Sequence, residues 1–287
     1  MVVLLHVAQQ LIIYRGMFQA EQIVTPPDYC ASSLCNIFNG SHVLQLPNIA
    51  CENNGTFGEI CGPLPKLLYM SARRRQFLLD MHNLVRNRIA GGNLSGYESA
   101  SNMPVLRWDA ELEAMAVLHA KRCQLVHDDC RNTPRFKISG QNIGYLWIGR
   151  KFKSHSRRIK SFVINWFREH NDANQSFIDS YHRHPSGKKI GHFTMLVGDR
   201  VHRVGCAAVK FLDATVNKFQ FLLTCNYDYD NIYSESIYQS GQAASKCTNG
   251  TSKMYPALCD WKIVCDNTKS DGNIEDANLM YNKIPGQ

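Results

Sequence analysis

The chain has 287 residues and is 44% hydrophobic, so it is long enough and apolar enough to bury a core, which excludes a disordered protein. Lys and Arg number 32 against 24 Asp and Glu, a formal net charge of +8 that attracts anionic partners. Apart from two clusters, at 73–75 and 151–160, the basic residues are dispersed. This distribution is typical of solvent-exposed helix faces and argues against a nucleic-acid-binding protein.

The first 20 residues have the pattern of a secretory signal peptide. An apolar stretch at 2–13 is followed by Arg15 and a small residue at Ala20, and it is too short to span a bilayer. No later stretch reaches the roughly 18 apolar residues that a spanning helix needs, so we expect no transmembrane segment. Five glycosylation sequons agree with secretion: Asn39, Asn54, Asn93, Asn174 and Asn249.

Residues 21–70 are predicted to form a cysteine-rich extension without sustained helix or strand periodicity. Four cysteines lie in it: Cys30, Cys35, Cys51 and Cys61. The whole chain has 11 cysteines at irregular spacing, and it lacks the repeated C-x2-C pairs of a structural zinc module. We therefore predict disulfides and an extracellular location. Because the count is odd, one thiol should be left over.

Three helices are expected after this extension. The first spans 72–89, with Ser71 as N-cap and Gly91 as terminator. The second begins after Asp109, whose side chain can cap it, and continues to Cys123. The third spans 157–170. Each has apolar residues at helical spacing, as expected for helices that pack on a core.

Three short runs of β-branched and aromatic residues, at 193–197, 204–211 and 219–227, are predicted to form an antiparallel sheet. Cys206 and Cys225 lie in the last two runs and could join neighbouring strands. Beyond residue 229 the chain has no clear period and carries three more cysteines. Helices followed by strands predict an α+β fold.

Three polar side chains have neighbours in the sequence that are expected to be buried. His127 stands between Cys123 and Cys130, Glu169 lies near the end of the third helix, and His192 opens the first predicted strand. Two imidazoles and a carboxylate can bind zinc if the fold brings them together. The alternative is a hydrogen-bonded polar cluster that holds no metal.

Four motifs in order resemble signatures of the CAP superfamily, which contains cysteine-rich secretory proteins, insect antigen 5 allergens and plant pathogenesis-related proteins. They are HNLVR at 82–86, GQNI at 140–143, GHFTMLV at 191–197 and CNYDYDN at 225–231. The cysteines of the extension, together with CQLVHDDC at 123–130, narrow the resemblance to the insect antigen 5-like, venom allergen-like secreted proteins.

This resemblance implies an α-β-α sandwich with a disulfide-stapled N-terminal extension. The CAP domain would occupy 71–241, and 242–287 would be a C-terminal extension with three cysteines. The resemblance also implies five disulfides and leaves Cys265 unpaired. The pairs would be Cys30–Cys51, Cys35–Cys130, Cys61–Cys123, Cys206–Cys225 and Cys247–Cys259.

The family's central cleft holds two histidines and two acidic residues, which carry over onto His127, Gln141, Glu169 and His192. Position 141 departs from the general pattern, because many members have Glu there. A neutral amide cannot act as a general base and is a weak zinc ligand, so hydrolysis would depend on Glu169 alone. His127 and His192 could still bind Zn²⁺ or another divalent cation, and no cofactor is required.

The function implied is that of a secreted, monomeric, non-enzymatic protein that binds an extracellular protein partner or a small apolar ligand such as a sterol or fatty acid. Trp147, Phe162 and Trp166 could line a lipid groove, although the last two have the spacing of helix core residues.

Two alternatives from other functional classes stay open. One is a metal-dependent hydrolase or protease that uses His127, His192 and Glu169. The other is an ion-channel modulator, which is disfavoured because the three cysteines after residue 241 are too few for the cysteine-rich domain of such proteins.

Overall fold

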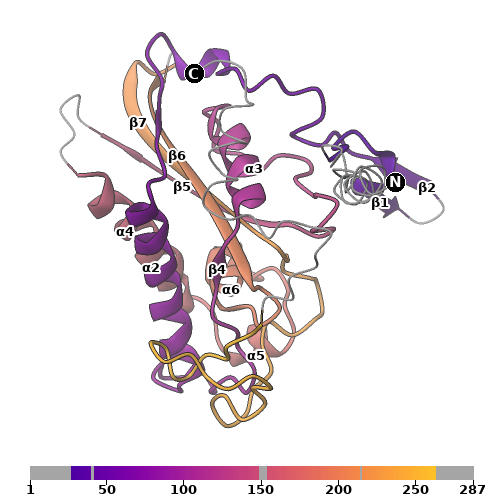
Figure 1. Ribbon diagram of the computed structural model, residues 1–287, viewed down its shortest axis with the longest axis vertical. Coiled ribbons are helices and arrows are strands. Elements are labelled where there is room, and N and C mark those ends of the chain that lie inside the picture. Colours follow the sequence, from indigo (N-terminus) through magenta and orange to yellow (C-terminus); the bar gives the residue numbers. More distant parts are fainter. Residues whose placement is uncertain (1–26, 40–41, 149–153, 214, 263–287) are drawn as a thin grey trace, which may run out of the picture.

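The computed structural model describes residues 27–39, 42–148, 154–213 and 215–262, and Figure 1 shows a central sheet with helices on both sides. The expected signal peptide and Cys265 lie outside these residues. Within the described ranges, no helix is long and apolar enough to cross a membrane. The helices are α2 (Ala72–Ala90), α3 (Ala110–Ala120), α4 (His155–Arg168), α5 (Gln175–Asp179) and α6 (Gly191–Val197).

The main sheet has the strand order β3-β6-β7-β5, and β4 pairs with β6 in parallel while the other pairs are antiparallel. Two further strands form a separate hairpin in the N-terminal extension. The strands are β1 (Asn36–Asn39), β2 (His42–Gln45), β3 (Lys66–Leu68), β4 (Arg107–Trp108), β5 (Gly140–Trp147), β6 (Arg203–Asp213) and β7 (Lys218–Tyr227). Short 3-10 turns lie at Ser32–Leu34, Glu59–Cys61 and Glu169–Asn171.

Two apolar cores lie on opposite faces of this sheet. The larger one contains Phe162, Phe193 and Phe221, with residues of α2, α4 and α6. The smaller one contains Ala116 of α3 and Leu222 of β7. Side chains alternate between the faces of a strand, so β7 supplies both cores. The predicted α-β-α sandwich is confirmed.

Two glycines let the helices approach the sheet closely. A Cβ atom at Gly205 in β6 would lie 2.1 Å from the backbone nitrogen of Glu113 in α3. At Gly144 in β5, it would lie 2.5 Å from the ring of Phe162 in α4. Both distances are shorter than any van der Waals contact, so each layer packs at its observed depth only because these positions lack a side chain.

The three predicted helices are present as α2, α3 and α4. Asp109 caps α3 as expected, because its Oδ1 accepts the backbone N–H of Glu111 at 3.0 Å and that of Leu112 at 3.1 Å. In α4 the buried residues recur at helical spacing: Ile159, Phe162, Val163, Trp166 and Phe167. The burial of this apolar stripe explains why the segment is helical.

The prediction of a strand at 193–197 is wrong. Residues 191–197 form α6, so His192 lies in the first turn of a helix and not at the start of a strand. The strand that was missed is β5, which begins at the Gly140-Gln141 motif and pairs along its whole length with β7. Strands therefore precede the third helix as well as follow it.

Arg86 of the HNLVR motif joins α2 to the segments around α6. Its side chain is fully buried, and its guanidinium donates hydrogen bonds to four backbone carbonyls: Pro104, Leu196, Gly198 and Val201. Burial lowers the pKa of Arg86 to about 10, and the nearby carboxylates of Asp199 and Asp228 oppose that shift. A planar group with five donors suits a site that offers several carbonyls and no adjacent carboxylate.

Five disulfides are present, and they are the five pairs that the family resemblance implies. They join Cys30–Cys51, Cys35–Cys130, Cys61–Cys123, Cys206–Cys225 and Cys247–Cys259. Two of them connect the N-terminal extension to the loop that follows α3, at the two ends of the 123–130 motif. The extension is therefore tied covalently on both sides of His127.

Candidate functional site

A cleft of about 830 Å³ lies beside β5, the last strand in the order of the main sheet. Its walls come from the loop after α3, from β5, from the segment 181–190, from the start of α6 and from the chain after β7. The residues that line it include His127, Arg131, Gln141, Tyr145, Tyr181, Arg183, Lys188, Lys189, His192, Asp230 and Tyr233. Its volume is typical of pockets that bind a ligand.

His127 and Gln141 form the first polar pair in this cleft. The Nδ1–H of His127 donates to Oε1 of Gln141 at 2.7 Å. An amide oxygen can only accept, so the proton of a neutral His127 ring resides on Nδ1 and its Nε2 carries a lone pair. The amide nitrogen of Gln141 donates to Oδ2 of Asp128 and to Oδ1 of Asn226, each at 3.0 Å.

Asp128 explains why an amide suits position 141. Its buried carboxylate forms an ion pair with Arg131 and also accepts the Gln141 amide. A glutamate at 141 would place a second carboxylate against that of Asp128 in a site with little water, where like charges repel strongly. The neutral side chain is therefore matched to its neighbour.

Glu169 and His192 form the second polar pair. Oε1 of Glu169 accepts the Nδ1–H of His192 at 2.6 Å. Oε2 accepts the backbone N–H groups of His192 at 2.9 Å and Phe193 at 3.2 Å, which are the first donors of α6. The carboxylate thus satisfies helix N–H groups that have no partner within the helix, and its negative charge faces the positive end of the helix dipole.

The Trp166 ring fixes the other side of His192. The two rings stack with centroids 5.9 Å apart and planes 17° apart. Since Nδ1 is held by Glu169, the ring has one orientation, in which Nε2 is the remaining nitrogen. Both cleft histidines are therefore held through Nδ1 by a neighbour on another element.

Burial lowers the pKa of His127, and the positive charge of Arg131 lowers it further, while the hydrogen bond to Gln141 and the carboxylate of Asp128 oppose the shift. His127 is consequently neutral near neutral pH. Burial also raises the pKa of Asp230 on the opposite wall. A neutral imidazole with its proton fixed on Nδ1 is the form that binds a metal ion through Nε2.

These two imidazoles fit a weakly bound divalent cation better than a structural zinc site. A histidine whose Nδ1–H is bound to a carboxylate or carbonyl oxygen has the arrangement usual for metal ligands. Within the described residues, however, no group of three or more His, Cys, Asp or Glu side chains is placed to hold a metal. A tightly bound zinc ion takes three or four protein ligands.

Three of the four residues named from the sequence, His127, Gln141 and His192, line this cleft. Glu169 is not a lining residue and reaches the site through its bond to His192. The aromatic groove does not form. Phe162 and Trp166 are each 4% exposed and belong to the larger core, while Trp147 is 48% exposed beneath the Lys218 ammonium. Sequence reasoning missed Asp128 and the basic segment 181–190. Asp128 directly follows His127, so its position beside the cleft could have been inferred.

Comparison with known proteins adds an independent observation. The model of the family described as "Cysteine-rich secretory protein family", or CAP, matches residues 79–227. The chain is 40% identical to venom allergen-1 of Aedes aegypti, over 81% of this chain and 87% of that protein. It is 41% identical to the antigen 5 like allergen Cul n 1 of Culicoides nubeculosus, over 68% of this chain and 88% of that protein.

Solved structures agree with this at the level of the fold. The crystal structure of NaASP2 with Zn²⁺ superposes with a TM-score of 0.52 at 23% identity, and it covers 66% of this chain and 96% of that one. The crystal structure of Na-ASP-1 gives a TM-score of 0.54 at 24% identity, covering 69% and 51%. At these identities the likeness extends to the fold alone.

Proposed function

The chain belongs to the cysteine-rich secretory protein family, and from that premise we propose that it is an extracellular, non-enzymatic protein whose cleft binds a protein partner. Five disulfides support the extracellular location, because such bonds form and persist in oxidising compartments. The relatives named as venom allergens and insect allergens agree with a protein that leaves the cell.

The internal bonding of Glu169 is the observation that carries the non-enzymatic part of the proposal. One of its oxygens holds the His192 ring and the other holds two backbone N–H groups. A general base must instead bind the proton of a water or a substrate. Gln141 cannot take that role either, so neither of the two positions that correspond to the family's acidic residues offers a free carboxylate for hydrolysis.

The charged rim favours a protein partner over a sterol or fatty acid. The lining of the cleft includes the cations Arg183, Lys188 and Lys189, the carboxyl group of Asp230 and the phenol rings of Tyr145 and Tyr181. An apolar ligand needs mostly apolar walls, but Phe162 and Trp166 are core residues and Trp147 is not among the residues that line the cleft. Carboxylates and backbone groups of an extended peptide match this lining better.

A divalent cation could assist such binding. The Nε2 atoms of His127 and His192 would hold it, with Gln141 and Glu169 fixing the two rings through their Nδ1 atoms. A bound Zn²⁺ would supply a positive charge that attracts carboxylate or carbonyl oxygens. No cofactor is needed for the binding role.

Selection of peptides from a displayed library of random linear sequences, on full-length protein secreted by insect cells, tests this proposal. We expect acidic sequences that bind the native protein and lose on the order of tenfold in affinity for Arg183→Glu/Lys189→Glu, because both cations lie on the rim. The matched control, Lys246→Glu/Lys253→Glu, makes the same charge change in the C-terminal segment and should bind normally.

Three results would contradict the proposal. Selected peptides might bind both double variants equally, lipid extraction and mass spectrometry might find one sterol or fatty acid at one molecule per protein, or purified protein might hydrolyse a peptide or ester with an activity lost in His192→Ala. The lipid result would restore the apolar-ligand expectation, and the last result would restore the hydrolase.

A further inference from the structure

The fold brings together the two basic clusters of the sequence. The first, around Arg73 and Arg74, begins α2. Of the second, Arg157, Arg158 and Lys160 lie in the first two turns of α4, and its first residues, 151–153, are outside the described ranges. Both helices begin beside the end of the main sheet where β3 pairs with β6. We call this the basic surface: Lys66, Arg73, Arg74, Arg157, Arg158, Lys160 and Lys210.

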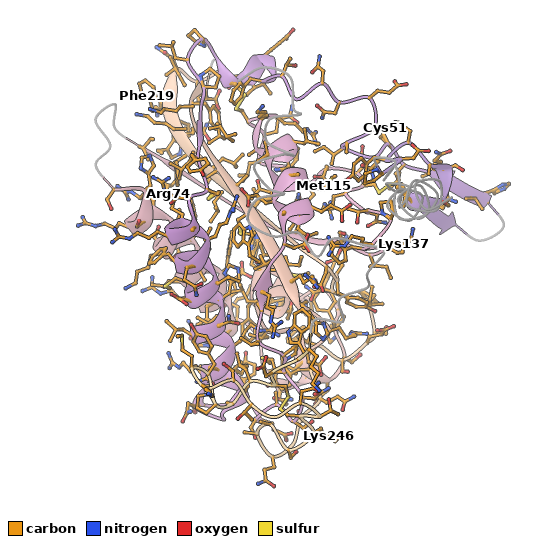
Figure 2. The ribbon with its side chains drawn as sticks, viewed as in Figure 1. Cys51, Arg74, Met115, Lys137, Phe219 and Lys246 are labelled. Atoms are coloured by element: carbon orange, nitrogen blue, oxygen red, sulfur yellow. A yellow bond between two sulfur atoms is a disulfide. The ribbon has the colours of Figure 1, made fainter. Side chains whose placement is uncertain are left out.

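Ring packing and strand register place the start of α4 over this end of the sheet. The His155 ring lies 5.9 Å from that of Phe221. Phe221 is directly opposite Lys210 in β6, and Lys210 is directly opposite Lys66 in β3, so all three side chains are on the same face of the sheet. Lys210 also lies over the Phe219 ring, and Figure 2 shows Phe219 and Arg74 on one side of the molecule, far from Lys246.

Electrostatics agrees with this placement. Burial lowers the pKa of His155, and the charges of Arg74, Lys210 and Lys66 lower it further. Cations from α2, β6 and β3 therefore act on one ring at the start of α4. Arg74 and His155, which are 81 positions apart in the sequence, therefore lie within electrostatic reach of each other.

Few acidic residues lie in the segments that form this surface. The segments 62–79, 154–168 and 203–212 contain no Asp or Glu, although the chain has 24 of them. Across the part of the chain that the structure describes, none of the ion pairs includes Arg73, Arg157 or Lys160, and all three are exposed. Arg75 differs, since it is buried and paired with Glu113.

We propose that the basic surface binds a linear sulfated polysaccharide of the extracellular space. Sulfate groups repeated along a chain match guanidinium and ammonium groups spread over two helices and a sheet end. The disulfides place the protein in an oxidising compartment, where such polysaccharides are the abundant linear polyanions. The exposed positions that open α4 are Ser156, Arg157, Arg158 and Lys160, which offer no apolar side chain to insert into a lipid bilayer.

This surface is distinct from the cleft, so the inference goes beyond the proposed function. Gln141 in the cleft pairs with Asn226, whereas Phe221 beneath His155 pairs with Leu146, five residues further along β5. Five residues of strand span about 17 Å. A polysaccharide on the basic surface would therefore leave the cleft open to a partner.

Surface plasmon resonance on immobilised heparin, with the full-length secreted protein, tests the inference. Arg73→Gln/Arg157→Gln/Lys160→Gln removes three exposed cations of the basic surface. At about 0.15 M ionic strength the dissociation constant should rise on the order of tenfold or more. The matched control is Lys137→Gln/Lys246→Gln/Lys253→Gln, which removes the same charge elsewhere and should change the dissociation constant by less than about twofold.

Four outcomes would overturn the inference. Native protein might not bind heparin, or both triple variants might lose affinity equally, which would mean attraction by net charge. Binding might be lost in Arg183→Gln/Lys189→Gln or on adding EDTA while the basic-surface variant still binds, which would place heparin in the cleft. Vesicles of phosphatidylcholine and phosphatidylserine might be bound more tightly than heparin, which would indicate a membrane. Because peptide selection on the cleft does not involve the basic surface, this inference can fail without the proposed function failing.

Discussion

His82 of the HNLVR motif is an imidazole that the fold keeps uncharged. Its side chain is fully buried, its Nδ1–H donates to the carbonyl of Leu78 at 2.7 Å, and its Nε2 accepts the Tyr227 hydroxyl at 3.0 Å. Burial lowers the pKa of His82 to about 4, and burial likewise lowers that of His119 to about 4. Both rings must stay neutral for the native state to persist.

These two histidines predict a loss of stability in weak acid. The folded pKa of His82 lies below its ordinary value of 6.5, so below 6.5 the unfolded chain takes up a proton that the folded protein does not. Its contribution is fully present above 6.5 and is lost as the pH falls toward about 4. Each such histidine costs up to about 3 kcal/mol over this range, from 2.5 pKa units at about 1.4 kcal/mol each.

Urea unfolding at a series of pH values between about 7 and 4.5 checks this prediction. The free energy of unfolding should decrease steadily as the pH is lowered. In His82→Asn this decrease per pH unit should be smaller, even though the variant is less stable at neutral pH. Equal slopes for the two proteins would show that the His82 ring is protonated in the folded state.

The residues of the cleft were easier to predict than their bonding. His127, Gln141 and His192 could be named because each stands in a recognisable motif, and Glu169 because the family's cleft has a second acidic residue. The reason why Gln141 suits its position could not be predicted, since it depends on the carboxylate of Asp128 across a hydrogen bond of 3.0 Å. A sequence motif specifies residue types, and tertiary packing decides which polar atoms meet.

At the level of secondary structure, α6 shows what a local pattern cannot reveal. The run Phe193–Val197 is mostly apolar with β-branched residues, has Thr194 as its single polar position and so shows no period, and is short enough for a strand. Its helical form is stabilised at the N-terminus by Glu169, which comes 23 residues before His192 in the chain. The strand β5 was missed for a related reason, because only its first residues were recognised as a motif and were interpreted as a turn.

The stabilisation of α6 by Glu169 gives a second prediction. Glu169→Ala removes the acceptor of two N–H groups in the first turn of α6, so the amides of His192 and Phe193 should exchange with solvent on the order of tenfold faster. The free energy of unfolding should fall by about 1 to 2 kcal/mol, as for other lost N-terminal caps.

Hydrogen exchange followed by NMR provides the measurement, and Glu169→Gln is the matched control. The amide oxygen of glutamine can still accept from the backbone, so this variant should exchange more slowly than Glu169→Ala. If the two amides keep their protection in Glu169→Ala, the carboxylate does not hold the helix.

At the scale of the whole molecule, the sequence predicted the helices and long strands that form the layers better than it predicted the short strands of the segments outside them. The spacing of apolar residues in the three long helices and in β6 and β7 predicted what the sandwich buries. The hairpin of β1 and β2 and the short β3 carried no such signal, because the extension is held by disulfides and not by a period.

The disulfide that ties the extension down should stabilise the protein more than the one in the C-terminal segment. Cys35 and Cys130 are 95 residues apart, whereas Cys247 and Cys259 are 12 apart. In the chain-entropy model the stabilisation grows with the logarithm of the loop length. For these two loops the expected stabilisations differ by about 2 kcal/mol. We therefore expect Cys35→Ala/Cys130→Ala to be about 2 kcal/mol less stable than Cys247→Ala/Cys259→Ala.

Urea unfolding of the two double variants without reductant measures this difference. Each variant replaces one pair of cysteines by alanines, so the chemistry of the substitution is matched. Equal stabilities, or a less stable Cys247→Ala/Cys259→Ala, would contradict the prediction and would mean that native-state contacts outweigh loop length.

The covalent clamp on the extension also fixes an order of events during biosynthesis. The chain is made from its N-terminus, so Cys30 can pair after 21 more residues, whereas Cys61 waits for 62 and Cys35 for 95. Two thiols of the extension therefore stay reduced until the segment around His127 has entered the same compartment. Closure of both bonds therefore reports that this segment has been made and has reached the extension.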